Sequence, residues 1–77
     1  MNPDEQQAEN VRSAYKRVFM DVMQNISLEE HLKDIEGAIE EIDISIAKER
    51  DNGGKTTSLE SVKNDLFYLK WQILERL

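Results

Sequence analysis

The chain has no cysteine and only one proline among its 77 residues. The absence of cysteine excludes a disulfide framework and thiolate metal sites, and it fits a reducing compartment. No apolar run approaches the roughly 20 residues that a membrane-spanning helix needs. Residues 1–5 are polar and acidic, unlike the basic and then apolar start of a secretory signal. We therefore expect a cytoplasmic protein that makes no membrane contact, although a protein exported without a cleaved signal would look the same.

The chain is also short and acidic. Its 77 residues make one small domain, 1–77, and a domain of this size buries only about 60% of its unfolded surface. The composition is 39% hydrophobic and 34% charged, which is typical of helical bundles and coiled coils. Without a disulfide to staple the fold, association with another chain, identical or not, is an expected way to complete the core.

Apolar residues recur at alternating steps of three and four in three segments, and residues so spaced share one face of an α-helix. The segments contain Ala8, Val11, Tyr15, Val18 and Val22; then Leu28, Leu32, Ile35, Ile39, Ile42 and Ile46; then Leu59, Val62, Leu66, Leu69 and Ile73. The pattern predicts an all-α fold with three helices over about residues 3–24, 28–50 and 58–77.

Residues that favour helix ends divide the three segments. Asn2 is expected to cap the first helix and Asn25 to end it in a left-handed conformation. Ser27–Glu30 and Thr57–Glu60 both match the capping box. Asp51–Gly54 is a strong stop, so the second and third helices should form an antiparallel hairpin. The junction after Asn25 has no glycine or proline; we favour a tight turn and a three-helix bundle there, with one kinked rod in an intertwined helical dimer as the alternative.

Acidic residues are concentrated in the second segment. Residues 28–47 contain seven acids and one base, Lys33, and their net charge of −6 equals that of the whole chain. The middle of the first segment, residues 11–20, has three bases and no acid. The acids can form a solvated face that pairs with these bases, or a face that selects a basic partner. This acidic face comprises Glu29, Glu30, Asp34, Glu36, Glu40 and Glu41.

Some apolar residues, and one glycine, lie away from the three stripes. A bundle widens each apolar face and can account for part of this set, but aromatic residues on one line are also common at interfaces. A glycine inside a helix costs about 1 kcal/mol relative to alanine, which favours close packing at its position. We therefore predict a protein-interaction surface from Phe67, Tyr68, Trp71 and Leu74 on the third helix, Ile44 and Gly37 on the second, and Met20 on the first.

Motifs for chemistry are weak. His31 is the only histidine, and it lacks further ligands at metal-binding spacing. Gly53–Thr57 resembles the end of a phosphate-binding loop, but position 49 is glutamate and the segment follows a helix instead of a strand. A calcium loop beginning at Asp51 fails because Lys55 stands at a ligand position. We expect no enzyme, catalytic residue, cofactor, metal or small-molecule substrate.

The sequence thus predicts a non-enzymatic protein–protein interaction module that acts by burying helix faces. Its partner would be another protein or a second copy, with a homodimer as the first expectation. A small phage or bacterial regulator or adaptor would fit. The alternatives are a structural coiled-coil subunit or a small secretion-type co-chaperone in a larger assembly. An acidic mimic of nucleic acid is a distant third, and direct nucleic-acid binding is not expected of so acidic a chain.

Overall fold

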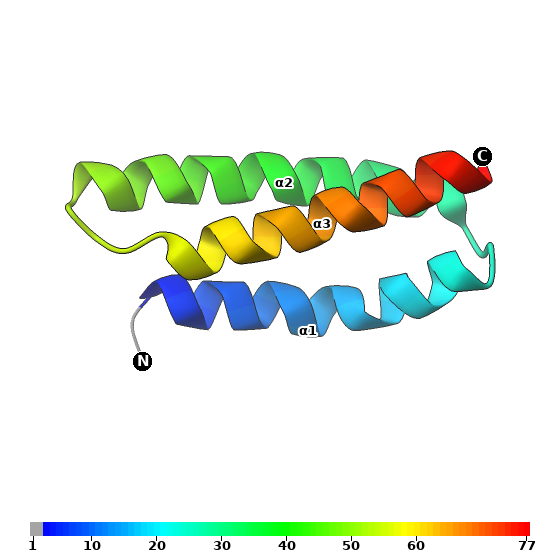
Figure 1. The fold of residues 1–77 in the computed structure, drawn as a ribbon, viewed down its shortest axis with the longest axis horizontal. Helices are drawn as coiled ribbons and strands as arrows, with labels where there is room; N and C mark the ends of the chain where they lie inside the picture. The colour runs from blue at the N-terminus through cyan, green and yellow to red at the C-terminus, as the bar shows by residue number, and fades with distance from the viewer. Residues whose placement is uncertain (1–2) are drawn as a thin grey trace.

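The computed structural model describes residues 3–77, which form three helices joined by two turns (Figure 1). The helices are α1, Pro3–Met23; α2, Leu28–Asp51; and α3, Thr57–Arg76. The predicted all-α fold and the hairpin of the second and third helices are confirmed. The single-rod alternative is wrong, because the chain reverses between α1 and α2. The predicted cap Asn2 lies outside the described residues.

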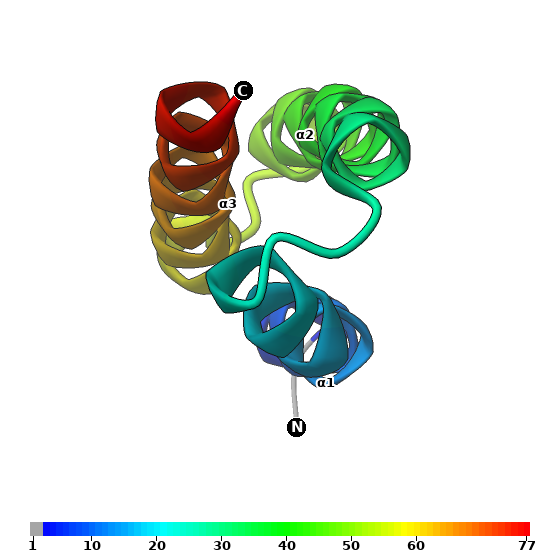
Figure 2. The ribbon, with the colours of Figure 1, turned by 90° about the vertical axis from the view of Figure 1, so that its right-hand side faces the viewer.

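Helix α3 is the centre of the arrangement. It packs along both α1 and α2, whereas α1 and α2 touch each other far less. The end-on view shows α3 alongside the other two helices, which lie apart from each other (Figure 2). The resulting body is elongated, 40 × 19 × 15 Å.

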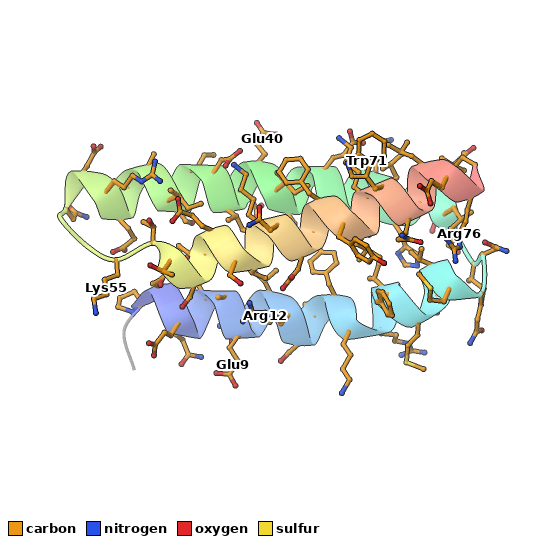
Figure 3. The ribbon with its side chains drawn as sticks, viewed as in Figure 1. Glu9, Arg12, Glu40, Lys55, Trp71 and Arg76 are labelled. Atoms are coloured by element: carbon orange, nitrogen blue, oxygen red, sulfur yellow. The ribbon has the colours of Figure 1, made fainter. Side chains whose placement is uncertain are left out.

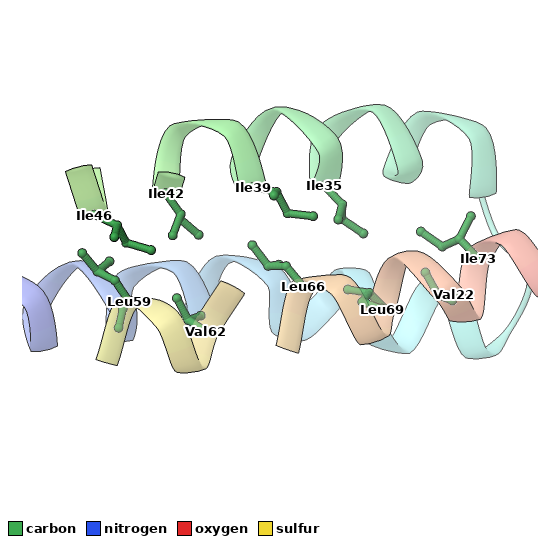
Figure 4. Close-up of a cluster of buried hydrophobic side chains, with 11 residues drawn as sticks. Val22, Ile35, Ile39, Ile42, Ile46, Leu59, Val62, Leu66, Leu69 and Ile73 are labelled. Carbon is green, nitrogen blue, oxygen red and sulfur yellow. The ribbon is translucent and has the colours of Figure 1, made fainter. Parts of the chain in front are cut away.

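The buried core consists of the predicted stripes, shown in part in Figure 4. Its residues are Ala8, Val22, Ile35, Ile39, Ile42, Ile46, Leu59, Val62, Leu66, Leu69 and Ile73. The stripe of α1 is covered less well, since Val11, Tyr15 and Val18 are only half-buried against this core. The middle of α1 therefore stays partly open to solvent.

Both turns begin with a Schellman motif. Asn25 (φ 59°) and Gly53 (φ 71°) provide the left-handed residue just after α1 and α2. In each turn the next amide donates to the carbonyl five residues back, over 2.9 Å after α1 and 2.7 Å after α2. The predicted left-handed role of Asn25 and the stop at Gly53 are confirmed.

Neither predicted capping box forms. Ser27 adopts a left-handed conformation (φ 50°, ψ 43°) and its side chain makes no cap hydrogen bond, because capping requires an extended residue. The reversal between α1 and α2 uses two left-handed residues, and Ser27 is the second. At α3 the helix begins one residue early, and its first residues are capped from another helix.

Asp4 of α1 caps the N-terminus of α3. Its carboxylate accepts the backbone N–H of Ser58 at 3.0 Å and of Leu59 at 2.8 Å. Glu60, the expected partner in the capping box, instead accepts from Arg50 at 2.6 Å. A negative charge at a helix N-terminus also interacts favourably with the helix dipole. This contact joins the start of the chain to the start of α3 and sets the register of α1 along it.

Candidate protein-interaction surfaces

The predicted interaction residues of α3 lie on its surface. Phe67, Trp71 and Leu74, which we call the aromatic stripe, are 38%, 63% and 43% exposed. Tyr68 is exposed beside them. In Figure 3, Trp71 projects from α3 on the side where α2 lies. Tertiary packing therefore leaves this second apolar line of α3 largely uncovered.

Two lysines of α3 lie between the aromatic stripe and α2, and each forms an ion pair with α2. Lys63 pairs with Asp43, and Lys70 pairs with Glu36 at 3.5 Å. The Lys63 ammonium also lies 5.8 Å from the centre of the Phe67 ring, within range of a cation–π contact. Phe67 is thus held in place by its neighbours.

The acidic face is divided between two flanks of α2. Glu36 and Glu40 border a shallow groove that contains Phe67, on the α3 side. Asp34 and Glu41 lie on the α1 side, where their negative charges raise the pKa of Tyr15. Of the six acids in this face, only Glu36 forms an ion pair within residues 3–77. The face is therefore solvated, and Glu40 stands free beside the aromatic stripe.

Pairing between the bases of α1 and the acids of α2, one of the two possibilities for the acidic face, does not occur at Arg12. Its Nε lies 3.3 Å from an Asp65 oxygen, and its Nη2 donates to the Ser61 hydroxyl at 3.0 Å. Both partners belong to α3 because α1 packs mainly on that helix. Lys16 and Arg17 form no ion pair among the described residues.

The remaining predicted contact residues are not gathered at the stripe. Ile44 is 63% exposed on the outer side of α2, and Met20 is exposed on α1. A Cβ added at Gly37 would meet no atom within 4 Å, so nothing inside the described fold requires glycine there. The role of these three residues in binding stays a prediction.

A groove between α1 and α3 is the surface that the sequence did not reveal. It has a volume of about 350 Å³ and is bordered by Arg12, Lys16 and Asp65. Its apolar lining is Val11, Tyr15, Phe19, Val62, Leu66 and Leu69. Arg12 of α1 and Asp65 of α3 connect the two helices at the border of the groove. The groove exists because the half-buried residues of α1 are not fully covered by α3.

One signal for this groove is present in the sequence. Val11, Tyr15 and Phe19 recur at steps of four, which makes a ridge that slants across the stripe of α1. The predicted stripe of the first segment includes Val11 and Tyr15, but its spacing of three and four leaves out Phe19. Whether such a ridge is buried depends on the angle between α1 and α3. The spacing of apolar residues in the sequence does not give that angle.

Tyr15 also connects α1 to α2. Its hydroxyl donates to the backbone carbonyl of Asp34 at 3.1 Å. Burial raises the pKa of Tyr15 above the usual 10.0, and the negative charges of Asp34 and Glu41 raise it further. Both effects disfavour the phenolate in the folded chain.

The raised pKa of Tyr15 predicts a pH dependence of folding. Its stabilising contribution is fully present below pH 10.0 and is lost as the pH rises through the higher pKa of the folded state. The difference in unfolding free energy between the parent and Tyr15→Phe should therefore shrink above pH 10.0. Denaturant titrations of both proteins on either side of that pH test this. A constant difference would contradict the assignment.

His31 and Asp21 form one polar contact between α2 and α1, with Nε2 and Oδ2 3.1 Å apart. No group of three or more possible ligands within residues 3–77 is placed to hold a metal ion. No helix in this part of the chain is both long and apolar enough to cross a membrane.

The two surfaces that stand out are thus the aromatic stripe on the α2 side of α3 and the groove on its α1 side. Comparison of the chain with protein-family models, with curated proteins and with solved structures finds no match.

Proposed function

We propose that this chain is a non-enzymatic protein-interaction module and that the aromatic stripe is its main binding surface. The observation that carries the proposal is the exposure of Trp71, 63%, beside a core that is already packed without it. Exposed large apolar side chains on one helical line are typical of helix-in-groove or helix-on-helix recognition. Trp is also among the residues that contribute most to interface energies.

The charge beside the stripe indicates the chemistry of the partner. Lys63 and Lys70 are paired with α2, so they do not offer free positive charge to a ligand. Glu40 is unpaired and exposed on the same side. A partner helix with an apolar face flanked by lysine or arginine would complement this border, and its cations could also stack on Trp71.

A peptide titration tests this function. The probe is a Leu/Lys amphipathic helix about four turns long, and a Leu/Glu peptide with the same apolar face is its matched control. We expect the emission of Trp71, the only tryptophan, to shift to the blue with the Leu/Lys peptide and to respond much less to the Leu/Glu peptide.

Variants locate the binding surface. Anisotropy of the labelled Leu/Lys peptide should show at least about 30-fold weaker binding to Trp71→Ala, the effect of a hot-spot residue. Ile26→Ala, which removes an exposed apolar side chain from the turn after α1, should bind as the parent does. Equal binding by Trp71→Ala and the parent would exclude the stripe as the site.

A further inference from the structure

The molecule carries two uncovered apolar surfaces, and they differ in charge. The groove between α1 and α3 is bordered by Arg12 and Lys16, and residues 11–20 contain no acid. The acid at its rim, Asp65, is already paired with Arg12, whereas Lys16 forms no ion pair among residues 3–77. The free charge at the groove is therefore positive.

The aromatic stripe lies on the other flank of α3 and has the opposite border. Its neighbours on α2 are Glu36, which is paired, and Glu40, which is not. Figure 3 shows Glu40 on the α2 side of the molecule, away from Arg12. The free charge beside Phe67, where Glu40 lines the shallow groove, is therefore negative.

We propose that the aromatic stripe of one copy docks into the α1–α3 groove of a second copy, so that the chain associates head to tail. This inference rests on the proposed function, because it names the stripe's partner as a second copy of the chain. The groove matches the aromatic stripe in both respects. Its lining, which includes Phe19 and Leu69, is apolar, and the unpaired cation of Lys16 lies beside it.

Contacts between like surfaces are less favourable. Two stripes placed face to face would offer no cation to either Glu40, and two grooves would offer no anion to either Lys16, whereas complementary charge favours a specific contact. The stripe–groove contact pairs unlike charges instead. Because the two surfaces lie on different flanks of α3, one copy can use both at once. A standard interface takes about 800 Å² from each partner, which is a small part of the 5287 Å² surface.

A head-to-tail contact has a recognisable behaviour in solution. Each added copy brings a free stripe or a free groove, so assemblies grow beyond the dimer or close into a ring. Sedimentation velocity of the full chain over a concentration series should show this growth. Trp71→Ala removes the anchor of the stripe and should weaken association about 30-fold. Lys16→Glu reverses the charge at the groove and should weaken it about tenfold.

A mixture of the two variants gives the sharpest test. Trp71→Ala retains an intact groove and Lys16→Glu an intact stripe, so an equimolar mixture should form dimers with the affinity of the parent contact but little larger species. Lys55→Glu, an exposed charge reversal in the turn before α3, changes the net charge equally and should associate as the parent does. Circular dichroism establishes that each variant remains helical.

Several results would overturn the inference. One is a parent chain that stays monomeric at every concentration. Another is a Lys16→Glu variant that associates as well as Lys55→Glu, since the groove would then play no part. A third is a mixture that forms no dimers. If the chain stays monomeric yet binds the Leu/Lys peptide through Trp71, only self-association is wrong; if it also fails to bind the peptide, the proposed function is wrong as well.

Discussion

We expect Ile42→Ala to lower the free energy of unfolding by about 3 kcal/mol and Ile44→Ala to change it by less than about 0.5 kcal/mol. The two residues are of the same type and lie two positions apart in α2, but Ile42 is 1% exposed and Ile44 is 63% exposed. Removing the buried side chain leaves a cavity in the core. Removing the exposed one leaves no cavity, and alanine has the higher helix propensity.

Denaturant unfolding followed by helical circular dichroism measures both effects. A domain of this size has a total stability of only about 4–12 kcal/mol, so the loss at Ile42 would be easily resolved. A large loss at Ile44 in a protein shown to be monomeric would mean that the outer side of α2 is covered in the folded chain, contrary to the structure. Equal small losses at both positions would contradict the packed core.

The second large effect is expected at Asp4. Asp4→Ala should lower the free energy of unfolding by about 2 kcal/mol, because two amides at the start of α3 lose their charged acceptor. Asp4 is only 3% exposed, so water cannot simply replace it. The result would show that α1 holds the beginning of α3 in place.

Two further variants separate this cap from a general effect of charge. Asp4→Asn keeps a side-chain oxygen that can accept one of the two N–H groups, and it should lose about half as much stability. Glu9→Ala removes an exposed acid from the same helix and should change the stability by less than about 0.5 kcal/mol. A loss at Asp4 no larger than that at Glu9 would contradict the cap.

The helices and their core were predictable from the sequence for a physical reason. In a bundle this small, each helix buries a single stripe, so a spacing of three and four marks the core directly. Every residue of the observed core, from Ala8 to Ile73, belongs to a predicted stripe. The left-handed ends at Asn25 and Gly53 were also predictable, because few residue types adopt that conformation easily.

The features that could not be predicted from the sequence depend on contacts between segments that are distant in the chain. Asp4 caps Ser58, which lies 54 positions further along the chain, and no local motif signals such a bond. The local capping box expected at Thr57–Glu60 does not form: the helix begins at Thr57 itself, Asp4 accepts the amides of Ser58 and Leu59, and the Glu60 carboxylate accepts from Arg50. The α1–α3 groove likewise depends on how far two helices diverge. The exposure of the aromatic stripe is easier to predict. Helical spacing places Trp71 on the opposite side of α3 from the buried residues of that helix.

The buried core of this protein forms without the aromatic stripe, which remains open to solvent. Acrylamide quenching of Trp71 in a dilute sample shown by sedimentation to be monomeric tests that claim most directly. We predict red-shifted emission and quenching close to that of a free tryptophan amide, since 63% of this residue is exposed. Blue-shifted emission that resists quenching in the monomer would show that Trp71 is part of the core and would contradict the account.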